Sequence, residues 1–142
     1  VRAHQYRTRP LANIAKRHEA CCGVEAAAIA AARPGTPMGK ILQAMQKAYE
    51  ENGFTDEWRL HHQGGPIGYE GRDQILTAPG AKAPVQENQA FALNPSITGA
   101  KSEDTFIVRE NDNDIITATK NWPAIKCETE NGTVERLDLL IL

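Results

Sequence analysis

The chain has 142 residues, with 16 basic and 18 acidic side chains and a formal net charge of −2 at pH 7. This length suits one domain with a real core, and the composition, 41% hydrophobic and 24% charged, is ordinary for a globular protein. The near balance of charges argues against a nucleic-acid partner, for which a clustered basic surplus is expected. No apolar run reaches the roughly 20 residues that span a bilayer, and no signal peptide is recognisable, so we expect a cytoplasmic protein without a membrane partner.

The three cysteines, Cys21, Cys22 and Cys127, are an odd number without the spacing of a metal site. Neighbouring Cys21 and Cys22 point to different faces of a helix, which argues against a disulfide framework. A reducing cytosol suits this usage better than secretion. We expect at least one of these cysteines to be a small core residue.

Two helices are predicted in the first third of the chain. Residues 1–8 alternate weakly and could be a strand or an extended lead-in, and residues 10–33 have helical spacing and many alanines. After a proline–glycine pair, Thr36 is the expected N-cap of a second helix and Pro37 its first residue. An Asn-Gly pair ends this helix, and its apolar side chains recur at amphipathic spacing: Met38, Ile41, Leu42, Met45, Ala48 and Tyr49.

Beyond the helices the pattern predicts strands. Residues 58–62 are expected to form a strand with alternating faces, and residues 77–89 a surface loop. Residues 90–94 form a strand that stops at a proline. Residues 104–108 form another strand, and residues 115–119 pair back on it as a hairpin.

The tail of the chain predicts a second hairpin. Asn131 and Gly132 are a typical hairpin turn between the two arms of residues 125–142. The last residues are so apolar that they should be buried. Two helices followed by antiparallel strands indicate the α+β class.

Residues 60–73 hold the densest set of reactive groups, with two histidines, four glycines, one arginine and two carboxylates. Such glycine density indicates a tightly turning backbone or the close approach of another group. Histidine, arginine and carboxylate side chains carry out acid–base and anion chemistry. A polar loop between two elements explains the same composition, so this run alone leaves both interpretations open.

Three sequences carry a family resemblance: His61-His62-Gln63-Gly64-Gly65-Pro66-Ile67-Gly68, Leu93-Asn94-Pro95-Ser96 and Lys101-Ser102-Glu103-Asp104-Thr105. They resemble the His-x-x-Gly-His-x-x-Gly run, the Glu-Pro-Gly strand end and the Arg-x-Glu-Asp-Thr strand of the M24 metallopeptidases. This family includes methionine aminopeptidase, the Xaa-Pro peptidases and creatinase. The resemblance runs from about residue 10 to residue 123. It implies the C-terminal half of a pita-bread fold, with two helices packed on an antiparallel curved sheet.

The resemblance also implies where the family's site residues fall. The family holds two divalent metals with two aspartates, one histidine and two glutamates, and both aspartates lie upstream of the part that this chain resembles. The ligand histidine falls on Gly65, the first glutamate on Asn94 and the second on Glu103. The substrate-side histidine falls on His61, and a second active-site histidine falls on Arg72.

These substitutions predict that the metal site is lost. A two-metal site balances about four positive charges with carboxylates and acidifies a bound water, and one carboxylate is too few for that. We therefore expect no metal ligand and no cofactor from this chain. A divalent metal of the Mn, Co or Zn type is expected only if the family site is intact in a parent protein. His62 could replace the missing histidine only through a bulge, because neighbouring strand residues point to opposite faces.

The family includes creatinase, a metal-free hydrolase of a C–N bond, so the resemblance still implies hydrolase chemistry. His61, His62 and Glu103 are the expected catalytic residues, with a histidine as general base or acid. Arg72 and Asn94 are the expected substrate-binding residues, and Arg72 would grip a carboxylate in bidentate fashion. Ordinary alternatives remain: the histidines satisfying backbone groups, Arg72 in a surface ion pair, and Glu103 on a solvated edge.

We expect one M24-like catalytic-domain fragment over residues 1–142, with a helix pair at residues 10–53 and a sheet with a C-terminal hairpin at residues 57–142. The leading function is a peptidase-family hydrolase acting on a small-molecule or peptide-like substrate. The alternative is a non-catalytic module that binds a ligand or a partner. Since the chain begins with Val1, it is either processed or a piece of a longer protein. Half of a pseudo-symmetric fold leaves a sheet edge uncovered, so we expect self-association or an N-terminal half supplied by the parent protein.

Overall fold

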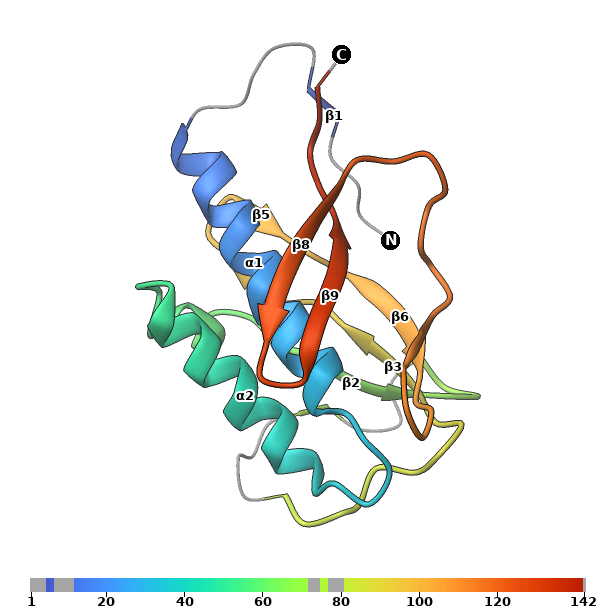
Figure 1. The fold of residues 1–142 in the computed structure, drawn as a ribbon. Helices are drawn as coiled ribbons and strands as arrows, with labels where there is room; N and C mark the ends of the chain where they lie inside the picture. The colour runs from blue at the N-terminus through green and yellow to red at the C-terminus, as the bar shows by residue number, and fades with distance from the viewer. Residues whose placement is uncertain (1–4, 7–11, 72–74, 77–80, 142) are drawn as a thin grey trace.

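The protein is described by a computed structural model, which covers residues 5–6, 12–71, 75–76 and 81–141. Two helices lie side by side, with strands packed around the first of them (Figure 1). The four-stranded sheet lies on one side of this helix, and the C-terminal hairpin crosses it on the side facing the viewer. This arrangement confirms the predicted α+β class.

Helix α1 (Ala12–Ala31) and helix α2 (Met38–Glu51) confirm the predicted helix pair. Alanines and other small residues of α1 are buried, which allows α2 and the hairpin to approach it closely. The apolar face of α2 is buried as its spacing predicts. Asn52 caps the helix and Gly53 follows at φ +79°, a left-handed conformation that favours glycine.

The predicted N-cap of α2 is wrong. The helix begins at Met38, Pro37 precedes it in the cap position, and no side chain caps it, so Thr36 does not have that role. Instead the Met38 N–H donates to Ala83 O at 2.9 Å. A chain segment about forty-five residues away therefore satisfies the helix end, which local sequence patterns do not reveal.

A four-stranded antiparallel sheet has the order β2 (Gly64–Ile67), β3 (Ala90–Leu93), β6 (Asp104–Ile107) and β7 (Asp114–Ile115). It confirms the strands predicted near residues 90–94 and 104–108, whereas the predicted strand over residues 115–119 is shorter and lies earlier. Phe91 and Phe106 face each other across β3 and β6, with ring centroids 5.6 Å apart, and both are buried.

The remaining strands form three small pairs. The hairpin predicted at Asn131 and Gly132 is confirmed, with Gly132 at φ +115°. Leu139 near the C-terminus is buried, but Ile141 is 51% exposed, so the expected burial of the whole apolar tail is wrong in part. The pairs are β1 (Gln5–Tyr6) with β10 (Leu140–Ile141), β4 (Ser96–Ile97) with β5 (Ala100–Lys101), and β8 (Ala124–Thr129) with β9 (Gly132–Leu137).

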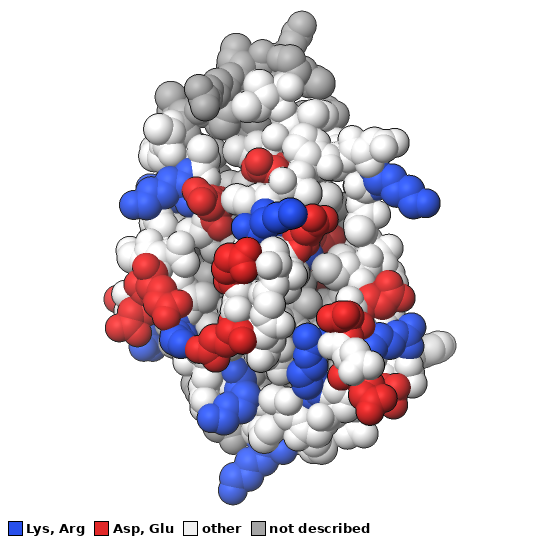
Figure 2. Space-filling view, in the orientation of Figure 1, with Lys and Arg blue, Asp and Glu red and all other residues white. Residues whose placement is uncertain are grey.

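All three cysteines are buried as free thiols, which confirms their prediction as core residues. Burial raises the pKa of Cys21 to about 12 and that of Cys127 to about 11, so both are inert thiols at neutral pH. Among the helices in the described ranges, none is both long and apolar enough to cross a bilayer. Acidic and basic side chains are interspersed over the face shown in Figure 2.

Candidate functional site

The two histidines lie in a turn and not in a strand, so the strand predicted over residues 58–62 is wrong. A short 3-10 helix, η1 (Glu57–Arg59), occupies its place and the chain then bends through His61 and His62. The physical reason is the buried Gln63 side chain. Its amide donates back to Trp58 O at 2.9 Å and to His61 O at 2.6 Å, which folds the turn around it.

The two imidazoles have opposite hydrogen-bonding states. His61 Nδ1 lies 2.6 Å from the His62 carbonyl oxygen, which accepts only, so Nδ1 carries the proton and Nε2 of the neutral ring has the lone pair. The Gly64 N–H donates to His62 Nδ1 at 3.3 Å, so in the neutral His62 ring Nε2 carries the proton. The rings stack with centroids 4.4 Å apart. This pair therefore presents one base and one donor.

Helix α2 holds this turn against the strand ends through Tyr49. The Tyr49 hydroxyl lies 3.0 Å from Gln63 Oε1 and 3.0 Å from Ser96 O, and it accepts the Ser96 N–H at 2.9 Å. Burial raises the pKa of Tyr49, so the hydroxyl keeps its proton. The Asn94 N–H also donates to Gln63 O at 3.2 Å. The histidine turn is thus fixed beside the segment that carries Asn94.

Asn94 and Glu103 lie on neighbouring strand ends. Leu93 pairs with Asp104 in the register of β3 and β6, and both are buried on the core side. Because side chains alternate along a strand, the adjacent Asn94 and Glu103 are placed on the other face. Gly65 pairs with Ala92 one step farther into the same sheet. The strand register therefore places Gly65, Asn94 and Glu103 near one another at this end of the sheet.

Asn94 is an unusual buried polar residue. It is 3% exposed, and its Oδ1 has no hydrogen-bond partner within the residues that the structure describes. Buried polar atoms almost always have partners, because leaving one unsatisfied costs about 1–3 kcal/mol. Asn94 Oδ1 is therefore a candidate acceptor for an N–H or O–H group of a ligand.

Glu103 lies beside a cation. The Lys101 Nζ is 3.5 Å from Glu103 Oε2, and both side chains are largely shielded from solvent, at 18% and 25% exposure. The prediction that Glu103 is part of the site is not tested by this pairing, but the position is more enclosed than a solvated strand edge. Arg72, the other expected substrate-binding residue, lies outside the described residues.

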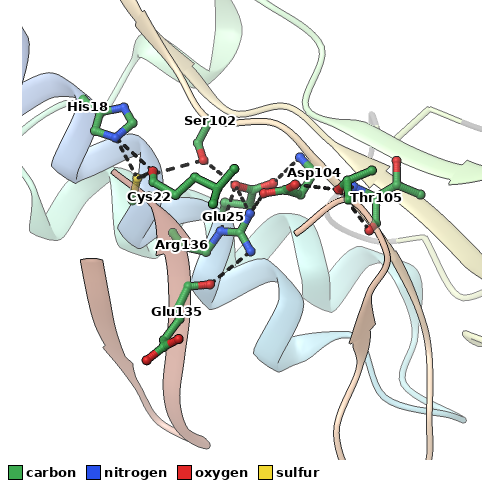
Figure 3. A network of polar contacts seen from close by, with 10 residues as sticks. His18, Cys22, Glu25, Ser102, Asp104, Thr105, Glu135 and Arg136 are labelled. Atoms are coloured by element: carbon green, nitrogen blue, oxygen red, sulfur yellow. Dashed lines mark hydrogen bonds and ion pairs between the residues drawn. The ribbon is translucent and has the colours of Figure 1, made fainter. Parts of the chain in front are cut away.

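Behind Glu103 lies a buried ion-pair network that the sequence analysis missed (Figure 3). The Arg136 guanidinium from β9 lies between two carboxylates, with Nε and the nearest terminal nitrogen each 3.1 Å from Glu25 Oε2, and it is also paired with Asp104. All three residues are buried. Burial raises the pKa of Glu25, and the neighbouring Arg136 opposes this rise.

This network holds the backbone on both sides of Glu103. Glu25 accepts a hydrogen bond from the Ser102 hydroxyl, and its Oε1 accepts the Asp104 N–H at 2.7 Å. Ser102 and Asp104 are the two neighbours of Glu103 in the chain. The one sequence feature that pointed to this network is a lone carboxylate, Glu25, within the most alanine-rich part of α1.

The positions carried by this chain do not fit the pair of divalent ions that the family resemblance implies. Gly65 has no side chain, Asn94 offers a neutral amide, and Glu103 already lies beside the Lys101 ammonium. Within the described ranges, no group of three or more His, Cys, Asp or Glu side chains is arranged to hold a metal ion.

Two known groups of proteins are similar to this chain in sequence. The model of metallopeptidase family M24 matches residues 3–117. The agropine synthesis cyclase of Rhizobium rhizogenes is 29% identical over 116 residues, which cover 78% of this chain and 29% of that protein.

The fold is similar to two solved structures. A dipeptidase from Mycobacterium ulcerans has a TM-score of 0.72 and 21% identity, over 94% of this chain and 33% of that chain. The Xaa-Pro dipeptidase from Bacillus anthracis has a TM-score of 0.71 and 18% identity, over 94% of this chain and 34% of that chain. These likenesses confirm the predicted half of a pita-bread fold. The chain spans about a third of the length of each of these proteins.

Proposed function

The chain belongs to metallopeptidase family M24, and from that premise we propose that it forms part of an active site that breaks a C–N bond of a small substrate with histidines in place of a two-metal centre. The observation that carries the proposal is the stacked His61–His62 pair, with its base and its donor, in a turn that is hydrogen-bonded to the segment carrying Asn94. The dipeptidases of similar fold support an amide as the substrate class.

In the proposed reaction His61 Nε2 takes a proton from a water molecule while the water oxygen bonds to the substrate carbonyl carbon. His61 then returns this proton to the nitrogen as the C–N bond breaks, while His62 Nε2–H donates a hydrogen bond to the substrate oxygen that becomes negatively charged, so that charge and atoms balance. Asn94 Oδ1 accepts a substrate N–H, and Glu103 orients the group beside it. Arg72 is proposed to bind a substrate carboxylate.

The relative named as a cyclase supports a variant of this chemistry. In a ring closure the nucleophile is a group of the substrate itself, and His61 can take the proton of that group and pass it to the leaving group in the same way. Which nucleophile is used is a separate question, and labelled water answers it. Hydrolysis introduces one oxygen-18 atom from labelled water into the product, whereas ring closure introduces none.

The test uses the natural protein that contains this chain, purified without chelator. We expect far less than one divalent ion per chain by elemental analysis, and turnover of dipeptides or related small amides that is unchanged by EDTA. His61→Gln should lower kcat/KM by about 10²–10⁴-fold, since general-base catalysis contributes about that much, with an unchanged melting temperature. Two stoichiometric ions, or activity that EDTA abolishes, would show that the proposal is wrong.

The second candidate is a non-catalytic module that binds a partner, and the uncovered sheet favours it. Among the described strands, β2 pairs only with β3, and the apolar side chain of Ile116, which follows the edge strand β7, is 56% exposed. Because an open strand edge and an exposed apolar surface favour association, we propose that the isolated chain pairs with a second copy of itself.

Sedimentation velocity checks this association. We expect the isolated chain to form a dimer, and Ile116→Lys to shift it to the monomer, because a charge on that surface opposes burial. Ile141→Lys is the matched control, since Ile141 is similarly exposed at 51% but lies on β10, outside the four-stranded sheet. A monomeric wild-type chain would refute the association.

A further inference from the structure

We propose that Gln63 is the positioning residue of this site: its buried side-chain amide holds the histidine turn in the shape that keeps the proton of His61 on Nδ1 and the lone pair of the base on Nε2. The inference rests on the proposed function, because it names the residue that controls its base. Gln63 lies at an unspecified position of the family's His-x-x-Gly-His run, so the resemblance assigns it no role. In this role it acts through His61 and does not touch the substrate.

The hydrogen bonds of the Gln63 amide all have partners inside the protein. The residue is 1% exposed, so water does not satisfy the amide. Its Nε2 donates to Trp58 O at 2.9 Å and to His61 O at 2.6 Å. Because a carbonyl oxygen only accepts, these two contacts fix which end of the amide faces the turn. Its Oε1 faces the other way and accepts the Tyr49 hydroxyl at 3.0 Å. This set of partners suits an amide, and neither a carboxylate nor a thioether of similar length.

Gln63 reaches the His61 ring through the backbone of the turn. By donating to His61 O it holds the peptide unit that joins His61 to His62. The next peptide unit supplies the His62 carbonyl oxygen, which accepts from His61 Nδ1 at 2.6 Å. The hydrogen bond of one imidazole nitrogen decides which tautomer the neutral ring adopts. If the turn opens, the ring is no longer held in one tautomer, and only a fraction of the molecules has its base at Nε2.

The same residue ties the histidine turn to the segment that carries Asn94. The Gln63 main-chain oxygen accepts the Asn94 N–H at 3.2 Å. The buried Tyr49 hydroxyl, which bonds to Gln63 Oε1, also accepts the Ser96 N–H at 2.9 Å. Helix α2, the histidine turn and the end of β3 therefore meet in one hydrogen-bonded junction. A change at Gln63 should thus move the base relative to Asn94 as well as loosen the core.

NMR of this chain with nitrogen-15 in its histidines tests the proposal without any substrate. The chain has four histidines, and the variants His61→Gln and His62→Gln assign two of their signals. At a pH above the titration of the imidazoles, the nitrogen-15 shifts distinguish a ring nitrogen that carries a proton from one with a lone pair. We expect the proton of wild-type His61 on Nδ1. Gln63→Met removes both donors and should convert His61 to a mixture of the two tautomers.

Two further variants make this test decisive. Tyr49→Phe removes one hydroxyl and keeps the ring, so it leaves Gln63 Oε1 without its donor and should give a smaller conversion. Gln89→Met is the control, because the Gln89 side chain also bonds to a turn, where it accepts the Gln86 N–H at 3.0 Å, but at the opposite end of β3 from the histidine turn. It should lower the melting temperature without changing the His61 tautomer.

An unchanged His61 tautomer in Gln63→Met would overturn the inference, as would the same mixture in Gln89→Met or a wild-type proton on Nε2. If Gln63→Met does not fold, Tyr49→Phe decides between these outcomes. In the natural protein, Gln63→Met should lower kcat by about 10²-fold with little change in KM, because a misplaced base leaves substrate binding intact. A change in KM alone would contradict the positioning role. Failure of the proposed function is distinguishable, because it appears as metal-dependent activity of the wild type, whereas the NMR measurement needs no activity.

Discussion

Replacing Gly64 with alanine should destabilise the protein by about 3–5 kcal/mol or prevent its folding. Gly64 has φ +90°, and a Cβ built there lies 2.1 Å from Ala92 O and 2.9 Å from Leu93 Cα. These atoms belong to the backbone of β3, the central partner of β2, so they cannot move aside without breaking the sheet. Chemical denaturation of Gly64→Ala beside the wild type measures the loss.

Gly35→Ala is the matched control for this prediction. Gly35 has a similar φ of +81°, but nothing lies within 4 Å of a Cβ at that position. Its substitution should lower the free energy of unfolding by only about 1 kcal/mol, which is the cost of placing alanine in a left-handed backbone conformation. The difference between the two variants isolates the close approach of β2 and β3. Equal losses would show that this approach does not limit the residue type at position 64.

Gly64 also explains why the sequence alone did not predict the histidine turn. The alternating side chains before the glycine run are typical of a strand. In the structure, strand β2 begins only at Gly64, because Gly64 has a positive φ and the Gln63 side chain is hydrogen-bonded within the preceding turn. A buried glutamine bonding to carbonyl groups earlier in the same turn has no recognisable local pattern. A turn, unlike a strand, allows the rings of neighbouring His61 and His62 to stack.

The elements that were predictable are those specified by local chemistry. The amphipathic spacing of α2, the Asn131 and Gly132 turn and the apolar strand that stops before Pro95 each depend on residues within a few positions of one another. The family motifs then aligned Gly65, Asn94 and Glu103, and the strand register places them together. Periodicity and motif order together were sufficient for this part of the fold.

The parts that were not predictable depend on contacts between distant segments. The cap of α2 comes from the segment that contains Ala83, and Arg136 reaches Glu25 across 111 positions of the sequence. Arg136 also lies beyond residue 117, where the match to the family model ends. No spacing rule relates a lone carboxylate in a helix to an arginine in a later hairpin. The C-terminal hairpin is nevertheless part of the support of Glu103.

Arg136→Met should destabilise the protein by about 3–5 kcal/mol near pH 8, because it leaves the Glu25 and Asp104 carboxylates buried without their cation. The control is Arg109→Met. Arg109 pairs with Asp114 at 3.7 Å on the surface, where both side chains are about half exposed, and the loss should stay below about 1 kcal/mol. Urea denaturation of both variants gives the comparison, and similar losses would contradict the importance of the buried pair.

The pH dependence of this effect follows from Glu25. Burial raises its pKa in the folded protein above the ordinary value of 4.5, so its contribution to stability is fully present below that value and is lost as the pH rises through the folded pKa. Arg136 lowers this pKa, so its removal should raise the pKa further and extend the loss to higher pH. The cost of Arg136→Met should therefore shrink as the pH falls from about 8 towards the ordinary Glu pKa of 4.5, because Glu25 becomes protonated. Arg136→Met/Glu25→Gln should abolish much of that slope and recover about 1–3 kcal/mol near pH 8, because the buried negative charge is gone. A loss that stays constant across this range would mean that the arginine acts through packing and not through its charge.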